Sequence, residues 1–571
     1  MSGVIPVAMF LFFAAAQSSP TNPASKPPDS AATVLNVTTR LVYVDVVVRD
    51  GAGQLVRNLT ERDFKVEEDG RPQKIDFFAA HGEALTGAAA VAPPSQRDEF
   101  SNVPAQSSPA VNMVLFDLLN TPQTDQLYAR RQLLKFLREL PSGQQVALFV
   151  LSDRLHVVQS FTSSSDRLVA AASAIDPKDF HFLRSTSQRM ADDDFLANFA
   201  AAIGPDPGNL IGHMQKDQVV EDARGSDIRA RATLQAFAEL ASAVSGYSGR
   251  KNLFWLSEHF PLVATSELQI NDLSTAVRFQ IADLPGQRDA ANLIASAQIA
   301  VYPISLAGLD TGGIGPEVSG AAEVTSMNDT LQDQFAVRQQ MRNILNDLAR
   351  QTGGEAFYGT NDFVGALQRG LHDGSNYYSL AYRPTNQRWD SKFRNIRVEL
   401  AHKGYSLSYR RGYLATPDAP QTGGSAGQLD FALQPQTPES TMLLLHAKMY
   451  QMVRPQPGVL LDSSLDAGNV AFTVTPDGHH HAQLLVKLIA FRDTGPQPIA
   501  VPENAGMLNV DLDAEHYGAV RKNGIAFRPQ LALPPGKYRL RLGVVDMTND
   551  RIGTLDVPFT AISPAGKAAA K

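Results

Sequence analysis

The chain has 571 residues, with 43% hydrophobic residues, 19% charged residues and a formal net charge of -7. That apolar content excludes a disordered chain, and at roughly 100–200 residues per domain the length predicts three or four domains. The mildly acidic balance and the lack of a basic run argue against nucleic acid as a partner. Because the chain has no cysteine, lipid attachment through cysteine, disulfides, thiol catalysis and zinc–thiolate sites are excluded.

The first segment, 1–16, is typical of a secretory signal peptide. Residues 4–16 form an apolar run that ends in three alanines, a small-residue cleavage pattern. The run is shorter than the ~20 residues that a membrane helix needs. We therefore expect an exported protein, periplasmic or extracellular, with no membrane span in the mature chain. Because the first residues lack Lys and Arg, an uncleaved apolar tail is the alternative.

Two Ser/Pro/Ala-rich stretches, 17–33 and 83–108, are predicted to be linkers. Between them, 34–82 is predicted to be a small β module. It contains the alternating strand "LVYVDVVVRD" and a hairpin around Asp69 and Gly70.

Residues 109–372 alternate between buried strands and helices. Continuous apolar runs occur at 110–117, 144–153, 251–258 and within 289–308, and helical patterns such as 229–246 separate them. Runs of this kind are typical of strands that are buried on both faces. The alternation predicts an α/β fold with a doubly wound parallel sheet. Two polar stretches, 184–227 and 310–335, are expected to be surface insertions.

After this region, 373–415 returns to alternating strands. This segment and 34–82 are each too small to bury a core, so we expect them to pair with each other in one β domain. A further linker, 416–429, leads to 430–562, which we expect to form a β-sandwich.

Several motifs, taken together, resemble one family. They are "RDGAGQLVRNLTERDFKVEEDGRPQKIDFF" before the α/β region, "FDLLNT" after its first strand, "GRKNLFWLSEHFP" at a later strand, and "SNYYSLAYRP" after the region. In this combination the chain resembles the VWFA-related family of acidobacteria, whose members contain a von Willebrand factor A domain. The resemblance covers about residues 35–415.

The resemblance implies a metal site at the carboxyl ends of the strands. In such domains oxygen ligands from three loops hold Mg²⁺ or Mn²⁺, and a partner protein supplies a carboxylate. The first loop usually reads D-x-S-x-S. Here Asp117 and Thr121 match, Leu119 replaces a serine, and Asn120 offers an amide oxygen. Glu258 stands where the third loop usually has an aspartate, so the implied site is a degenerate one.

The same residues have a metal-free interpretation. Thr121 precedes Pro122, and a threonine in that position is a candidate helix N-cap. Asp117 would then accept backbone N–H bonds or favour the positive end of the helix. Both interpretations stay open. The sequence does not identify the second-loop threonine; the candidates are Ser226, Thr233 and a residue of 184–188.

We expect no metal site or catalytic site at the other polar motifs. We expect Asp153 to orient its loop rather than to bind metal. His479, His480 and His481 follow a tight turn, and because strand residues alternate faces only the first and third can converge, so we expect an exposed turn. The run 257–259 (Ser-Glu-His) has the composition of a hydrolase triad, but consecutive residues cannot form that geometry.

The sequence therefore predicts an exported, non-catalytic, protein-binding protein of the adhesion or scaffold type. Its partner would be another protein, which supplies an acidic residue if a metal is bound. The alternative is a metal-independent envelope assembly or cargo-handling factor. A secreted hydrolase is a third interpretation, for which the sequence offers no nucleophile and base.

Overall fold

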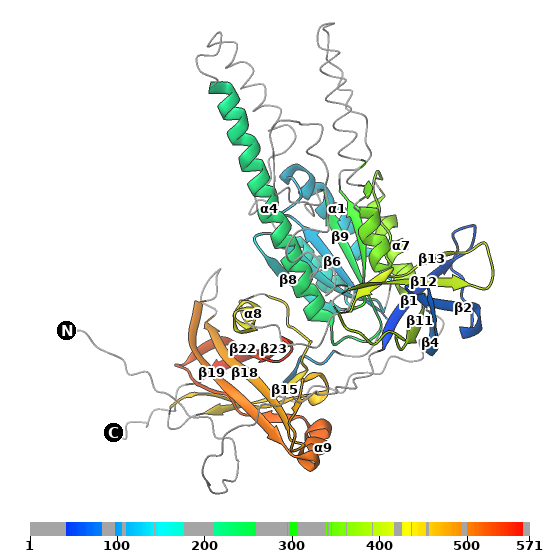
Figure 1. The fold of residues 1–571 in the computed structure, drawn as a ribbon. Coiled ribbons are helices and arrows are strands. Elements are labelled where there is room, and N and C mark those ends of the chain that lie inside the picture. The colour runs from blue at the N-terminus through cyan, green and yellow to red at the C-terminus, as the bar shows by residue number, and fades with distance from the viewer. Residues whose placement is uncertain are drawn as a thin grey trace, which may run out of the picture.

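The computed structural model describes residues 41–82, 98–104, 110–175, 210–258, 294–306, 339–415, 425–452, 456–492 and 499–562, apart from a few residues inside these ranges. The expected leader, 1–16, and first linker, 17–33, lie outside the described residues. The fold is mixed α/β, with several sheets and more strands than helices (Figure 1). In the described part of the chain, no helix is long and apolar enough to cross a membrane.

One sheet contains the parallel strands. Its members are β6 (Ala110–Asp117), β7 (Gln145–Leu151), β8 (Leu155–Thr162), β9 (Arg250–Ser257) and β10 (Ile299–Ser305), in the order β10-β9-β6-β7-β8. Strands β10, β9, β6 and β7 pair in parallel, which confirms the expected parallel sheet. The edge strand β8 pairs antiparallel with β7 and was not expected.

Helices cover both faces of this sheet. One face packs against α1 (Gln123–Arg138), α2 (Ser165–Ser173) and α7 (Phe363–Ser375), and the other packs against α4 (Leu210–Val244). Every residue of β6 is buried, because alternate side chains face the two helical layers. Of the expected surface insertion 184–227, residues 210–227 form the first half of α4. That half extends beyond the sheet in Figure 1.

The segments on either side of the parallel-sheet domain form one β domain, which we call the split β domain. Its first sheet has the order β13-β1-β11-β4, and its second has the order β14-β12-β2-β3. Each sheet therefore combines strands from both segments, and the two sheets share one apolar core. The strands are β1 (Val42–Arg49), β2 (Phe64–Glu68), β3 (Arg71–Gln73), β4 (Ile75–His81), β11 (Tyr377–Tyr382), β12 (Phe393–Leu400), β13 (Ser406–Ser408) and β14 (Gly412–Leu414), with a short 3-10 helix η1 (Glu61–Asp63).

A buried polar centre links the two segments of the split β domain. Glu68 of β2 is 2% exposed, and Arg394 of β12 lies 3.3 Å from its Oε1. The hydroxyls of Tyr382 and Tyr413 each donate to Glu68 Oε2 at 2.8 Å. Because a buried carboxylate is costly without partners, the second segment stabilises the first through these contacts.

The C-terminal part is a sandwich of two sheets around a large apolar core. One sheet has the order β20-β16-β15-β5, with β21 beside β16, and the other has the order β17-β18-β22-β23, with β19 beside β18. Its elements are β5 (Glu99–Ser101), α8 (Ser425–Ala432), β15 (Leu445–Met452), β16 (Gly458–Leu465), η4 (Ala467–Asn469), β17 (Thr473–Val474), β18 (His480–Arg492), β19 (Ile499–Leu512), α9 (Ala514–Asn523), β20 (Ile525–Phe527), β21 (Gln530–Ala532), β22 (Gly536–Asp546) and β23 (Ile552–Ala561).

Both expected linkers flanking these regions need correction. Residues 98–104 of the expected linker 83–108 belong to the sandwich, where β5 pairs antiparallel with β15. The expected linker 416–429 is wrong from Ser425, where α8 begins. Side chains of α8, including Leu429, pack on the outer face of the sandwich sheet. The sequences of β5 and α8 do not by themselves favour a strand or a helix. In both cases contacts with strands that are distant in sequence stabilise the element.

The sandwich also contacts the end of α4. Thr441 N donates to Ser242 O at 3.0 Å, and the Thr441 hydroxyl donates to Ala243 O at 2.8 Å. The same hydroxyl accepts from Gly246 N at 2.8 Å. These bonds satisfy the last carbonyls of α4, which a helix cannot satisfy internally.

Asn102 anchors β5, the strand that precedes the parallel-sheet domain in sequence but belongs to the sandwich. Its Nδ2 donates to Ser440 O at 2.8 Å and to Leu443 O at 2.9 Å, and its Oδ1 accepts from Leu445 N at 2.6 Å. The side chain is 5% exposed, so these backbone groups lie away from water. The Asn102 side-chain amide therefore forms hydrogen bonds with three buried backbone groups of the sandwich.

We expect Asn102→Ala to lower the free energy of unfolding by about 3 kcal/mol, because several buried backbone groups lose their partner and each costs about 1–3 kcal/mol. The measurement is the urea midpoint of the full chain, followed by circular dichroism. Asn504→Ala is the matched control, since Asn504 is half-buried and makes one bond, to Gln530 O. Equal midpoints for the two variants would contradict the role of Asn102.

Candidate functional site

The candidate site lies at the carboxyl edge of the parallel sheet. From β6 the chain continues to β7 on one side, and later returns to β9 on the other side of β6. The strand order thus reverses between β6 and β9, and open α/β sheets usually bind ligands at such a switch point. Asp117 ends β6 and Ser257 ends β9, so both lie at this point.

The Asp117 carboxylate is completely buried and is surrounded by donors. Its Oδ1 accepts from Asn120 N at 3.0 Å. Its Oδ2 accepts from Asn120 Nδ2 at 2.8 Å and from Trp255 Nε1 at 2.9 Å. The Ser257 side chain is also hydrogen-bonded to this carboxylate. The chain itself therefore supplies four donors to the two carboxylate oxygens.

Burial and hydrogen bonding act in opposite directions on this group. Burial raises the pKa of Asp117 to about 6, and the bonds from Asn120, Trp255 and Ser257 oppose that rise. At neutral pH the group is therefore mainly ionised. The donors make a buried negative charge tolerable at the end of a central strand.

Thr233 is the one second-loop candidate that the structure places at this site. Asn120 Nδ2 donates to Thr233 Oγ1 at 3.0 Å, and Thr233 Oγ1 donates to Arg229 O at 2.9 Å. Thr233 lies on α4, so the network joins the first loop to the helix that covers the opposite face. The side chain of Ser226 and the run 184–188 lie outside what the structure describes.

Thr121 does not cap α1, so the N-cap interpretation of this residue is wrong. Pro122 occupies the N-cap position of α1, without a side-chain cap bond. The Thr121 hydroxyl instead accepts from Glu258 N at 3.3 Å, across to the end of β9. Gln126 Nε2 donates to Thr121 O at 2.7 Å and to Leu118 O at 3.1 Å, which holds the loop against the first turn of α1.

The four residues predicted as ligands thus lie at one edge of the sheet but in two hydrogen-bonded pairs, Asp117 with Asn120 and Thr121 with Glu258. A hard cation needs oxygen ligands in a near-octahedral array. Asn120 instead turns its NH₂ group toward Asp117, and its buried Oδ1 makes no hydrogen bond with the described residues. The donors already bonded to Asp117 occupy the lone pairs that a cation would use. This geometry fits the metal-free interpretation better than a Mg²⁺ or Mn²⁺ site.

Sequence reasoning missed the contributions of Trp255 and Gln126. Trp255 is fully buried in the core, and its Nε1 donates to Asp117, a bond that the sequence motifs did not predict. Only part of the signal lay in the sequence, because a buried indole N–H usually needs an acceptor. That β9 is the neighbour of β6 is known from the structure. For Gln126 no signal exists in the sequence, since a polar residue on the first turn of a helix is ordinary.

The remaining motifs do not add to this site. Asp153 bonds to Ser152 Oγ and His156 Nε2 in the turn between β7 and β8, as expected of a residue that orients its loop. Ser257 is fully buried beside Asp117, and His259 lies outside the described residues. A Ser-Glu-His triad therefore has no support in the geometry.

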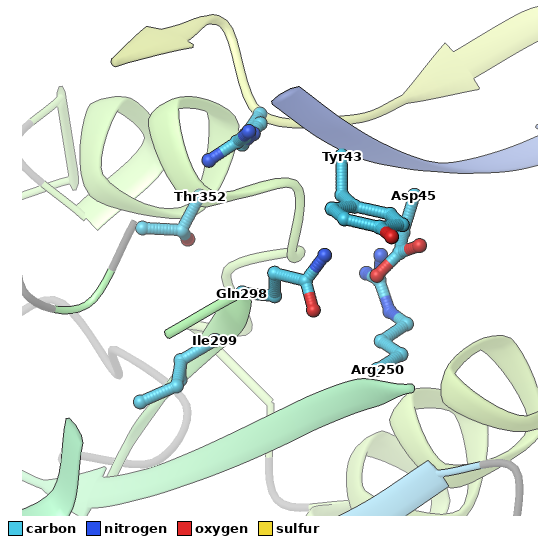
Figure 2. A pocket seen from close by; sticks show the side chains of 7 residues that line it. Tyr43, Asp45, Arg250, Gln298, Ile299 and Thr352 are labelled. Carbon is cyan, nitrogen blue, oxygen red and sulfur yellow. The ribbon is translucent and has the colours of Figure 1, made fainter. Parts of the chain in front are cut away.

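A small pocket lies at the opposite edge of the sheet, where β1 meets the first residues of β9 and β10 (Figure 2). Several of its polar groups are hydrogen-bonded within their own domains. Arg250 Nη2 donates to Gly353 O at 2.6 Å and to Tyr302 Oη at 3.1 Å, and Asp45 accepts from Ser379 at 2.7 Å. The pocket is lined by Tyr43, Asp45, Arg250, Gln298, Ile299, Thr352 and Arg410.

No protein-family model matches the chain, and no curated protein matches it. Among solved structures, an aerotolerance-related membrane protein from Bacteroides fragilis is 10% identical, with a TM-score of 0.24, over 46% of this chain and 98% of its own. BatB from Bacteroides thetaiotaomicron is 10% identical, with a TM-score of 0.21, over 46% and 95%. The human COPII-coat protein Sec24c is 9% identical, with a TM-score of 0.25, over 80% and 44%. Likenesses this low carry no argument about function.

We expect Trp255→Phe to destabilise the fold at neutral pH, with the lost donor to Asp117 costing about 1–3 kcal/mol. The smaller ring adds a packing cost that does not depend on pH. Since the donor opposes the rise in the pKa of Asp117, the variant raises that pKa further. A carboxyl whose pKa is higher in the folded state loses stability as pH rises from about 4 through the folded value.

The cost of Trp255→Phe should therefore be larger at pH 8 than at pH 5, measured as urea midpoints. The control is Trp389→Phe, the same change at the second of the two tryptophans, which lies in the split β domain. A cost for Trp255→Phe that does not change with pH would contradict the bond to the carboxylate.

Proposed function

We propose that this chain is an exported, non-catalytic, protein-binding protein with a von Willebrand factor A-like domain that works without a resident metal ion. The parallel-sheet domain is the A-like domain, and its carboxyl edge carries the degenerate first loop. Of the functions that the sequence leaves open, this is the metal-independent assembly or cargo-handling factor.

The observation that carries the proposal is the state of Asp117. Its buried carboxylate is bonded to Asn120, Trp255 and Ser257, all from the same chain. A metal-dependent adhesin needs this carboxylate, directly or through water, for a cation whose open position a partner fills. Here Asp117 instead joins β6 to β9, and Asn120, bonded to Asp117, reaches Thr233 of α4. These contacts stabilise the edge that a partner would meet.

The sheet topology supports the relation to A domains. The order β10-β9-β6-β7-β8 places the end of a central strand at the switch point, and helices cover both faces. The motifs "FDLLNT" and "GRKNLFWLSEHFP" fall on the two strand ends that meet there. Export rests on the apolar run 4–16 with its alanine cleavage pattern.

We expect calorimetric titration of the full chain with Mg²⁺ and Mn²⁺ to give no saturable binding that depends on Asp117. Two variants test this: Asp117→Ala, which also disrupts the network, and the milder Thr121→Val, which removes a predicted ligand hydroxyl. Saturable binding in the unaltered protein that Thr121→Val abolishes, with the fold intact by circular dichroism, would establish the metal-dependent alternative.

Protein binding and export can be tested together in intact cells that produce the protein. We expect a membrane-impermeant, amine-reactive cross-linker to join the chain to a partner protein, in equal yield with and without EDTA. Thr121→Val is the matched variant and should leave that yield unchanged. Loss of the adduct in EDTA would favour a metal-dependent adhesin. Adducts that form only with a membrane-permeant reagent would contradict export.

A further inference from the structure

Two histidines of the C-terminal sandwich lie on one face of a β-hairpin, at the start of β18. His481 pairs with Asp511 of β19, and His479 directly precedes β18. Because strand residues alternate faces, His480 points to the other face, where its ring stacks on Tyr517 of α9 with centroids 3.7 Å apart. The rings of His479 and His481 are 6.2 Å apart and within 25° of parallel.

The two imidazoles share one carboxylate. His479 Nδ1 lies 2.8 Å from Asp511 Oδ1, and His481 Nδ1 lies 3.6 Å from the same oxygen. A neutral imidazole that donates from Nδ1 keeps the lone pair on Nε2. Metal-binding histidines usually donate their other N–H to a carboxylate in this way, which fixes the tautomer and makes the ring a better ligand.

The surroundings favour a cation and leave room for one. The side chains of His479 and His481 are 42% and 37% exposed, so both rings can turn toward a common ion. The charges of Asp477, Asp511 and Asp513 all act on His479, and the bond to Asp511 is the main cause of its raised pKa. Within the described part of the chain, no group of three or more His, Cys, Asp or Glu residues is placed to hold a metal ion, so the two imidazoles need further ligands from outside this hairpin.

We propose that His479 and His481 form a two-imidazole chelate for a transition-metal ion of the Zn²⁺, Cu²⁺ or Ni²⁺ class, with Asp511 as the positioning residue. Imidazole nitrogen selects this class over Mg²⁺ and Ca²⁺, which prefer oxygen. A metal–nitrogen distance of about 2.0–2.1 Å requires the two rings to converge, which exposed side chains permit. Water, or a donor from a bound partner, completes the coordination.

The experiment is a Zn²⁺ titration of the full chain by calorimetry near pH 7.5. We expect saturable binding of one ion at this site, weakened at least about tenfold in His479→Gln and in His481→Gln. His480→Gln is the matched control, because it removes the neighbouring imidazole from the opposite face, and it should bind as the unaltered protein does. Asp511→Asn should weaken binding by about 10–100-fold, the usual effect of losing a carboxylate behind a ligating histidine.

The pH profile gives a second readout. Binding should fall as pH drops below about 6.5, where imidazole takes up a proton, and the fall should start at higher pH while Asp511 is present than in Asp511→Asn. Equal weakening by all three histidine variants, or no weakening by any, would mean an adventitious ion only and would overturn the proposal. Because Mg²⁺ does not suit two imidazoles, these results are independent of the Mg²⁺ titration that tests Asp117.

Discussion

Antiparallel pairing between β1 and β11 is the constraint on which the arrangement of the chain depends. It joins segments before and after the parallel-sheet domain. Both ends of that domain lie close together, since Ala110 and Tyr377 pack in one cluster with Val47 of β1. The two ends can meet because β6 begins at the amino edge of the sheet. The helix α7 runs antiparallel to the strands and ends at the same edge. Arg49 of β1 then forms an ion pair with Asp373 of α7. The amino edge is thereby committed to the domain junction, and Asp117 lies at the other edge.

The strand β5 imposes a second constraint of the same kind. The chain leaves the split β domain, contributes β5 and Asn102 to the C-terminal sandwich, and only then enters β6. The split β domain and the C-terminal sandwich are therefore each completed by residues that are remote in sequence. The parallel-sheet domain is inserted in the sequence between these contributions. Such ties favour domains that keep a fixed relation to one another, a property that suits a binding scaffold.

Strands buried on both faces could be predicted from the sequence, because an unbroken apolar run such as 110–117 is stable only when both of its faces are covered. The pairing of the flanking segments followed from their size alone. In contrast, β5 depends on a partner, β15, that is remote in sequence, and its Pro/Ser-rich surroundings indicate a linker. At the site, Asp117 could be recognised from its place after an apolar strand. Its bond to Trp255 depends on which strands are neighbours, and that is a property of the topology.

Two half-buried carboxyls at the contact between α4 and the sandwich differ from the fully buried Asp117. Burial raises the pKa of Glu239 and of Glu439 to about 7, with Asp556 adding to the rise at Glu439 and Arg541 opposing it at both. Carboxyls with raised values stabilise the docked form below about pH 4.5 and lose that contribution as pH rises through 7. Asp117, with its lower pKa and four donors, is already ionised there. Near neutral pH, proton uptake by Glu239 and Glu439 therefore acts on the contact between α4 and the sandwich.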